Sequence, residues 1–315
     1  MSKIDLRTTG DLLLAAQDLV LCCHVSPDGD TLGSALGLKL FLESQGKRVR
    51  LLVDDKIDKG FGFLPGSETI IRPQAGESYP TDLLVVIDAS SWDRIGITAD
   101  VVQPQHIMNI DHHISNTEFA EYLYLDPQAA AVGEVMCDLF LEMGWSYTPE
   151  IALNFYTAMS TDSGSFRYTN TTSKTMRRAG DLLDYGVNPT IISDNLDMKS
   201  RATAELFSKV LPTLTFEEEG RLAYISLSNA LYDENVSTEP FVYYPRYTEG
   251  VDVAVFFKAV EPEVTRVSMR SSKTDVAAIA LSFGGGGHIR AAGCTINAPL
   301  EKAREQLLAA LRKVM

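Results

Sequence analysis

Short apolar segments that end at a histidine or an aspartate recur through the first part of the chain, and this recurrence constrains the fold most strongly. The segments run from Leu19 to His24, onward from Val49, and up to Asp88 and Asp111. Their aliphatic, β-branched composition is typical of buried parallel strands. Apolar residues at helical spacing follow in segments 31–46, 129–143, 149–160 and 173–185. Strands alternating with helices predict an α/β fold with a doubly wound, mainly parallel sheet.

The pattern changes after about residue 185. A helical stretch near 200–210 is followed by RLAYISLS, VDVAVFF and VTRVSM, which alternate like strands of a separate sheet. A helical segment at 275–283, the run GGGG, the short strand CTIN and an amphipathic C-terminal helix complete the chain. We therefore predict a first domain over residues 1–185, a helical linker over 186–212, and a smaller α/β domain over 213–315.

The charge balance restricts the class of ligand. With 28 Lys and Arg against 42 Asp and Glu, the 315-residue chain has a net charge of −14. Such a chain should repel long duplex nucleic acid, although a short phosphorylated ligand can still bind local cations or metal ions. No apolar run approaches the ~20 residues that cross a bilayer, and the N-terminus does not resemble a secretory signal. We expect a cytoplasmic protein without a membrane partner.

The loop after the first strand carries the first group of candidate ligands. The segment from His24 through Asp28 to Asp30 places one imidazole and two carboxylates within seven residues. Alternate side chains of an extended loop point the same way, so the two carboxylates could face one site. Nitrogen and oxygen ligands of this kind suit Mn²⁺, Mg²⁺ or Fe²⁺. A turn with an Asp helix cap explains the same residues without a metal.

Further acidic and imidazole side chains stand where other elements end. Asp88 follows one apolar strand, Asp111, His112 and His113 close the next, and Asp162 ends a helix. Ligands of doubly wound sheets bind beyond the carboxyl ends of the strands, where these residues are expected. Adjacent histidines in an extended segment face opposite ways, so one can bind metal while the other faces substrate. Each residue taken singly is also compatible with a helix cap or a polar strand end.

Taken in order, these motifs resemble a known family. HVSPDGD, the Asp88 strand end, the Asp-His-His triplet and TDSGSFRYTN are similar to the four motifs of the DHH phosphoesterase superfamily. VSMRSS and GGGGHIRAAG resemble the substrate-binding domain of its DHH-associated type 1 (DHHA) branch. The likeness spans about residues 20–297. It points to the stand-alone NrnA-type proteins, which act on very short RNA and on 3′-phosphoadenosine 5′-phosphate (pAp).

The resemblance implies a binuclear metal site in the first domain. It implies one set of metal ligands formed by His24, Asp28 and Asp88, and a second set formed by Asp30, Asp88, His112 and Asp162. Asp88 would bridge two divalent ions, with Mn²⁺ favoured and Mg²⁺ or Fe²⁺ as alternatives. Asp88 and His113 would be the catalytic residues, and His113 would face the scissile phosphate. Carboxylates packed this closely raise one another's pKa values unless cations neutralise them, which agrees with a metal site.

The second domain is implied to bind substrate. The residues that match the family motifs are Arg270, Ser271, Gly285, Gly286, Gly287 and His288. Glycines let backbone N–H groups approach a phosphate closely, whereas a helix C-cap or hinge is the alternative explanation of the run. Four consecutive glycines exceed what a cap requires, which favours a ligand. Arg270 is expected to clamp a phosphate, while Arg94, Arg167 and Arg290 are left without a role.

The expected function is that of a hydrolase. We expect a metal-dependent phosphoesterase that cleaves short oligoribonucleotides such as pGpG or pApA, removes the 3′-phosphate of pAp, or does both. A cleft between the two domains would limit the length of the substrate. A cyclic-dinucleotide phosphodiesterase of the same family and a non-catalytic nucleotide sensor are the alternatives. The expected partner is a short RNA or a nucleotide, and the sequence leaves open whether the protein forms a homodimer.

Overall fold

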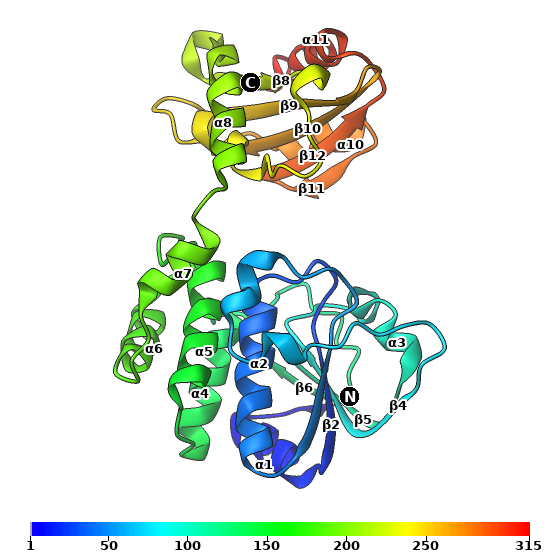
Figure 1. Cartoon of the computed structure of the whole chain (residues 1–315), viewed down its shortest axis with the longest axis vertical. Helices are drawn as coiled ribbons and strands as arrows, with labels where there is room; N and C mark the ends of the chain where they lie inside the picture. Colours follow the sequence, from blue (N-terminus) through cyan, green and yellow to red (C-terminus); the bar gives the residue numbers. More distant parts are fainter. Residues whose placement is uncertain (1) are drawn as a thin grey trace. The chain divides into compact units, whose positions relative to one another are not determined.

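The computed structural model describes residues 2–315 and divides the chain into two compact units, with the boundary between Met198 and Lys199 (Figure 1). This boundary lies inside the segment 186–212, whose limits as a linker stay a prediction. No helix within residues 2–315 is long and apolar enough to cross a membrane.

The N-terminal unit contains a six-stranded parallel sheet with the strand order β1-β6-β5-β4-β2-β3. The strands are β1 (Ser2–Lys3), β2 (Asp18–Cys22), β3 (Arg48–Leu52), β4 (Tyr79–Ile87), β5 (Val102–Asp111) and β6 (Tyr122–Leu125). Alternate residues of one strand face opposite sides: Leu19 and Leu21 belong to the larger apolar core, and Val20 and Cys22 to the smaller one. The predicted α/β fold with a parallel sheet is confirmed.

Helices cover both faces of this sheet unequally. Figure 1 shows the longer helices gathered on one side and the short α3 (Thr98–Val101) on the other. The larger core is formed with α1 (Leu6–Ala15), α2 (Gly29–Ser44), α4 (Val132–Met143) and α5 (Pro149–Asp162). Two further helices, α6 (Ser173–Leu183) and α7 (Pro189–Leu196), complete the unit.

Glycines allow α2 and α5 to pack closely. A Cβ atom added to Gly33 would overlap the carbonyl oxygen of Asn154, and one added to Gly29 would overlap the side chain of Thr161. The N-terminus of α2 therefore lies against the C-terminal turn of α5. This contact brings the aspartates at the start of α2 close to Asp162, the last residue of α5.

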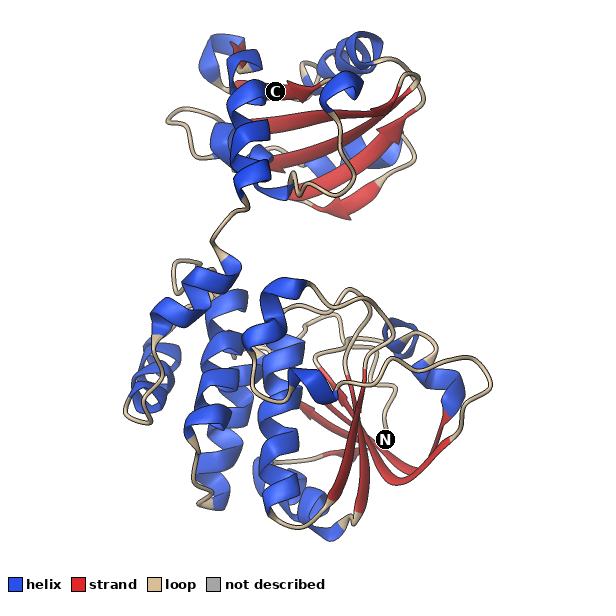
Figure 2. Ribbon diagram, viewed as in Figure 1, coloured by secondary structure: helices blue, strands red, loops and turns tan. Residues whose placement is uncertain are grey.

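The C-terminal unit has a mixed six-stranded sheet with the order β11-β12-β10-β9-β8-β7. Figure 2 draws its strands in red, with helices packed against them. Its strands are β7 (Thr215–Glu217), β8 (Leu222–Leu227), β9 (Val253–Glu261), β10 (Val264–Ser271), β11 (Gly286–His288) and β12 (Ala291–Ile296). Strands β8 and β9 pair in parallel, whereas β9 with β10, β10 with β12 and β12 with β11 are antiparallel. Its helices are α8 (Arg201–Val210), α9 (Tyr243–Arg246), α10 (Val276–Ser282) and α11 (Leu300–Leu311).

The two faces of this second sheet are packed differently. One face forms a core with α10 and α11, and Met269 and Val267 of β10 point into it. On the other face, apolar packing with α8 and with residues 241–242 involves Ile225, Leu227 and Phe256, which belong to β8 and β9. Among the described residues, the side chains of β10, β12 and β11 on this second face take no part in that apolar cluster.

Candidate metal centre and substrate-binding face

The carboxyl ends of three adjacent parallel strands carry candidate ligands. His24 lies two residues beyond β2, Asp88 follows β4 directly, and Asp111 is the last residue of β5. Because β2, β4 and β5 are neighbours in the sheet, these residues meet at one edge. The structure thus brings together side chains that are far apart in the sequence.

The two aspartates of the first loop reach the site through a helix and not through an extended loop. Asp28 caps α2 by accepting a hydrogen bond from the backbone N–H of Asp30 at 3.0 Å. Asp30 already lies in the first turn of α2, and its carboxylate accepts hydrogen bonds from Val132 N at 2.7 Å and Gly133 N at 2.9 Å. The expectation that alternation along an extended loop aligns the pair is wrong. Asp30 instead lies at the N-terminus of α4, where the helix dipole stabilises negative charge.

The first group of potential ligands contains His24, Asp28 and Asp88. The Nε2 atom of His24 lies 3.7 Å from Asp28 Oδ1 and 3.6 Å from Asp88 Oδ2. All three potential ligand atoms lie within 4.8 Å of one another. These separations exceed hydrogen-bond distances and match a set of donors arranged around a cation.

The second group adjoins the first and contains His112, Asp30 and Asp162. The Nε2 atom of His112 lies 3.8 Å from Asp30 Oδ2, 3.7 Å from Asp162 Oδ2 and 3.5 Å from Asp88 Oδ1. The ligand atoms of this group also lie within 4.8 Å of one another. Asp88 therefore contacts both groups, one through each carboxylate oxygen.

Asp88 is the residue whose environment most clearly requires a further partner. Its side chain is 3% exposed, and its φ of 60° is uncommon for a residue other than glycine. Among the atoms of residues 2–315, Oδ1 is buried without a hydrogen-bond donor. A buried, unpaired carboxylate oxygen is costly, and a bound cation would remove that cost. The residues present therefore fit a divalent metal ion.

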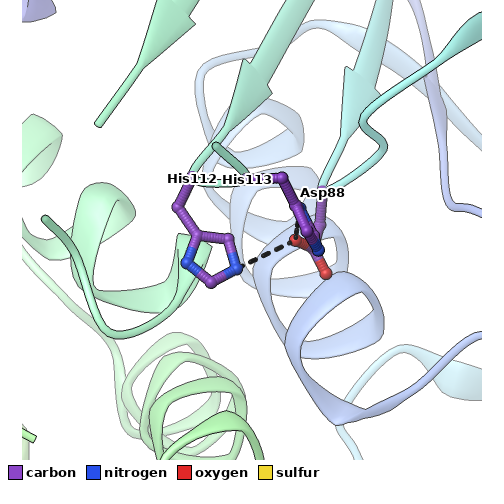
Figure 3. Close-up of side chains that lie close together, drawn as sticks. All are labelled: Asp88, His112 and His113. Atoms are coloured by element: carbon purple, nitrogen blue, oxygen red, sulfur yellow. Dashed lines mark ion pairs between the residues drawn. The ribbon is translucent and has the colours of Figure 1, made fainter. Parts of the chain in front are cut away.

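The two adjacent histidines differ in what they contact (Figure 3). The Nδ1 atom of His112 lies 3.1 Å from the carbonyl oxygen of Ala129, which leaves Nε2 as the free nitrogen facing the carboxylates. The Nδ1 atom of His113 lies 2.7 Å from Asp111 Oδ1 and 3.5 Å from Asp88 Oδ1. The His113 side chain is 43% exposed, against 13% for His112. Both rings thus lie beside Asp88, and the His113 ring is the more exposed of the two.

Asp111 has a positioning role that the sequence analysis missed. Its carboxylate is fully buried and accepts hydrogen bonds from the backbone N–H groups of His112 and His113 and from Asn116 Nδ2 at 2.5 Å. Burial would raise the pKa of Asp111, but the hydrogen bond from His113 lowers it below its usual value. The same hydrogen bond raises the pKa of His113. Asp111 therefore orients the His113 ring and favours its protonated form.

The electrostatics of the cluster also indicate a cation. Burial and the neighbouring Asp88 and Asp162 raise the pKa of Asp30 well above its usual value. Burial likewise raises the pKa of Asp88 and raises that of Asp162 to about 6. Burial alone would lower the pKa of His24, but the nearby carboxylates of Asp28 and Asp88 raise it to about 10. Positive charge is favoured throughout this site.

In the C-terminal unit, Arg270 and His288 share one face of the sheet. Arg270 on β10 pairs with Ala291 on β12, which pairs with His288 on β11. Residues directly paired across strands point to the same face. Ser271, one residue further, points to the opposite face, is 3% exposed and donates its hydroxyl to the Thr274 carbonyl oxygen at 2.5 Å. The structure therefore separates Ser271 from this face.

The fold itself requires most of the glycine run. Gly284, with a φ of 72°, follows the C-terminal turn of α10. A Cβ atom on Gly285 or Gly287 would overlap backbone atoms of β12. Gly286 is exposed and a Cβ there would meet open space, so its lack of a side chain is not explained by packing. Packing and backbone conformation therefore explain Gly284, Gly285 and Gly287, and a ligand role for Gly286 stays a prediction.

Comparisons with known proteins agree with this arrangement. Residues 18–159 match the DHH family, N-terminal domain, and residues 234–315 match the DHHA1 domain. The chain is 35% identical to the bifunctional oligoribonuclease and PAP phosphatase NrnA of Thermus thermophilus, over 98% of this chain and 94% of that protein. The chain belongs to the DHH–DHHA1 phosphoesterase family.

Other members of the family are similar over almost the whole chain. The bifunctional oligoribonuclease and PAP phosphatase NrnA of Bacillus subtilis is 26% identical over 88% of this chain and 89% of its own length. The crystal structure of an exopolyphosphatase-related protein from Bacteroides fragilis matches with a TM-score of 0.88 at 27% identity, over 98% of this chain and 95% of that one. The predicted family membership is confirmed.

The arginines without an assigned role can now be placed within this DHH–DHHA1 architecture. Arg94 Nη2 lies 3.3 Å from His24 Nδ1, so its exposed guanidinium adjoins the cluster. Arg167 Nε donates to the Gly164 carbonyl oxygen at 2.8 Å, and Arg290 donates to backbone carbonyls of the turn after β10. Arg94 is therefore the one of these three that contacts a candidate ligand.

Proposed function

We propose that this DHH-family chain is a metal-dependent phosphoesterase that hydrolyses short oligoribonucleotides such as pGpG or pApA to mononucleotides and removes the 3′-phosphate of pAp. The observation that carries the proposal is the pair of His and Asp groups that meet at Asp88. The printed names of the Thermus thermophilus and Bacillus subtilis relatives combine the same two activities.

The proposed metal ligands form two sets. One ion would be held by His24, Asp28 and Asp88, and a second by Asp30, Asp88, His112 and Asp162. The mixture of imidazole and carboxylate donors suits Mn²⁺, with Mg²⁺ and Fe²⁺ as alternatives. When bound, a pair of divalent ions lowers the pKa of water and offsets the charge that develops on the phosphoryl oxygens.

His113 is proposed to act on the substrate directly. Its ring is partly exposed, and Asp111 fixes its orientation through Nδ1. The hydrogen bond to Asp111 raises the pKa of His113, which favours the protonated form of the ring. A protonated imidazole at this place can donate a hydrogen bond to a phosphoryl oxygen or a proton to the leaving oxygen.

The DHHA1 domain is proposed to bind the parts of the substrate that are remote from the scissile bond. Arg270, Gly286 and His288 share the open face of β10, β12 and β11. Arg270 can bind a phosphate through two N–H groups, and the exposed backbone at Gly286 admits close approach. Ser271, Gly285 and Gly287 support this face from within the fold.

The decisive experiment compares turnover of four substrates by the purified chain with Mn²⁺. We expect hydrolysis of pApA and pAp, slower hydrolysis of a cyclic dinucleotide and of pyrophosphate, and loss of all turnover with a chelator. Asp88→Asn should abolish activity, whereas Asp11→Asn, which removes an exposed carboxylate from α1, should not. Binding of pApA and pAp without turnover would refute the proposal and favour a nucleotide sensor.

A further inference from the structure

A single backbone segment, residues 129–133, is hydrogen-bonded to two of the three residues in the second group of potential ligands. The carbonyl oxygen of Ala129 lies 3.1 Å from His112 Nδ1 and so directs the other nitrogen of that ring toward the carboxylates. The two N–H groups that begin α4 donate to the carboxylate of Asp30 at 2.7 and 2.9 Å. The orientation of both side chains therefore depends on where this segment lies.

The third residue of the group is connected to the same segment by Asn170. Its Nδ2 atom lies 3.1 Å from the carbonyl oxygen of Ala130 and 3.1 Å from that of Asp162. This amide thus joins the last turn of α5 to the backbone just before α4. Ligands that come from α2, from the end of β5 and from α5 share one point of attachment.

The side chain that fixes this segment is Glu134. It lies in the first turn of α4 and is fully buried. Its Oε2 atom accepts hydrogen bonds from the backbone N–H of Ala130 at 3.2 Å and from Thr175 Oγ1 at 2.7 Å. The N-cap of α4 is Ala131, whose methyl group cannot accept a hydrogen bond. Glu134 therefore reaches back over the start of its own helix, as the acidic residue of a capping box does.

Helix α6 neutralises the buried carboxylate. Lys174 Nζ lies 3.0 Å from Glu134 Oε1 and 2.9 Å from Asp138 Oδ2, and Thr175 of the same helix supplies the hydroxyl. A buried carboxylate is costly unless a cation and hydrogen bonds compensate it. Glu134, Lys174 and Thr175 all lie outside the motifs that resemble the family.

We infer that Glu134 is a positioning residue for one of the two proposed metal ions, acting through segment 129–133 on the second group of ligands. Within residues 2–315, no hydrogen bond joins this segment to His24, Asp28 or Asp88. The effect should therefore be specific to one ion. This inference rests on the proposed function, because it concerns an ion of that metal centre.

The test is a calorimetric titration of the full chain with Mn²⁺. Glu134→Ala should weaken binding of one ion about 10–100-fold and change binding of the other less than about threefold, as expected for an outer-shell residue of one ion. In anomalous difference maps at limiting Mn²⁺, the peak among Asp30, His112 and Asp162 should be lost first. Glu134→Gln should retain most of the affinity, because its amide oxygen can still accept the hydrogen bond from the segment.

A matched control disturbs the same helix contact without disturbing Glu134. Arg178 on α6 pairs with Asp138 on α4, at 2.8 Å between Nε and Oδ1. Arg178→Met should lower the stability of this contact and leave the affinity for both ions unchanged. If Arg178→Met acts like Glu134→Ala, or if Glu134→Ala weakens both ions equally or neither, the positioning role is overturned and the proposed function stands.

Amide hydrogen exchange of the metal-free chain gives a second, independent measurement. The N–H groups of Val132 and Gly133 begin α4 and have no acceptor within their own helix, so their protection reports on the contact with Asp30. Glu134→Ala should accelerate their exchange roughly 10-fold, as expected when one hydrogen bond is weakened, and Arg178→Met should not. Unchanged exchange in Glu134→Ala would overturn the inference. A parent chain that binds no Mn²⁺ would refute the proposed function, and the exchange rates would then decide alone whether Glu134 positions Asp30.

Discussion

Asp252 offers a sharp test of how the substrate-binding face is held in place. Its carboxylate lies just before β9 and accepts five hydrogen bonds from the turn that follows Arg270 and Ser271. The donors are Ser272 N (3.1 Å), Ser272 Oγ (2.9 Å), Lys273 N (2.6 Å), Thr274 N (3.3 Å) and Thr274 Oγ1 (2.7 Å). Asp252→Asn has nearly the same shape but removes the charge. We expect this variant to destabilise the turn.

The magnitude follows from the pKa of the carboxyl group. Burial would raise it, but the hydrogen bonds lower the pKa of Asp252 from its ordinary 3.8 to about 2. At 1.36 kcal/mol per unit, the shift corresponds to about 2.4 kcal/mol, which screening at this partly exposed site reduces to roughly 1–2 kcal/mol. Because the folded-state pKa lies below that of the unfolded chain, this stabilisation is complete above about pH 4 and is lost as the pH falls toward about 2.

The two units can be followed separately in the assay. Both tryptophans, Trp92 and Trp145, belong to the N-terminal unit, so tryptophan fluorescence reports on that unit during urea unfolding. Amide hydrogen exchange of β9 and β10 reports on the C-terminal unit. At pH 7, Asp252→Asn should lower the free energy of opening of β9 and β10 by roughly 1–2 kcal/mol and leave the fluorescence midpoint unchanged.

A matched control removes a charge without the hydrogen bonds. Glu249→Gln changes an exposed carboxylate in the same segment and should have no effect. Near pH 2 the parent and Asp252→Asn should exchange alike after correction for intrinsic rates. Equal protection at pH 7, or a difference that persists undiminished at pH 2, would refute this account of the turn.

The remaining predictions concern catalysis. Asp88→Ala should lose bound Mn²⁺ and lower turnover far beyond the ~10–100-fold typical of outer-shell residues, and near-parent turnover would rule out a ligand that contacts both groups. His113→Ala should lower kcat while Mn²⁺ content, measured by mass spectrometry, stays at the parent level; loss of metal in this variant with retention in His112→Ala would reverse the two roles. Arg270→Ala and His288→Ala should each impair hydrolysis of pApA and pAp but leave slow hydrolysis of bis-p-nitrophenyl phosphate unchanged. Equal loss on both kinds of substrate would instead place these residues in the catalytic centre or the fold.

The parallel sheet and the clustering at its edge could be predicted because they depend on local patterns. Apolar strand segments and helical periodicity are short-range signals, and a strand-end residue such as Asp88 must lie at the carboxyl edge of a parallel sheet. Strands β1 (Ser2–Lys3) and β6 (Tyr122–Leu125) escaped prediction because they have two and four residues. Strands this short carry too little periodicity to be recognised.

Other parts of the site depend on contacts between distant segments. Asp30 is oriented by backbone groups of α4, 102 and 103 residues away, so a local argument about the loop failed. Asp111 was overlooked as a positioning residue because its partners become visible only when burial is known.

The proposed catalysis depends above all on two metal ions held on either side of Asp88. The most direct test is an anomalous difference map from crystals of the full chain grown with Mn²⁺ and recorded at the manganese absorption edge. We predict two peaks, one among His24, Asp28 and Asp88 and the other among Asp30, His112 and Asp162, with Asp88 contacting both. A map without a peak at these residues, or with its manganese bound elsewhere in the chain, would contradict the account.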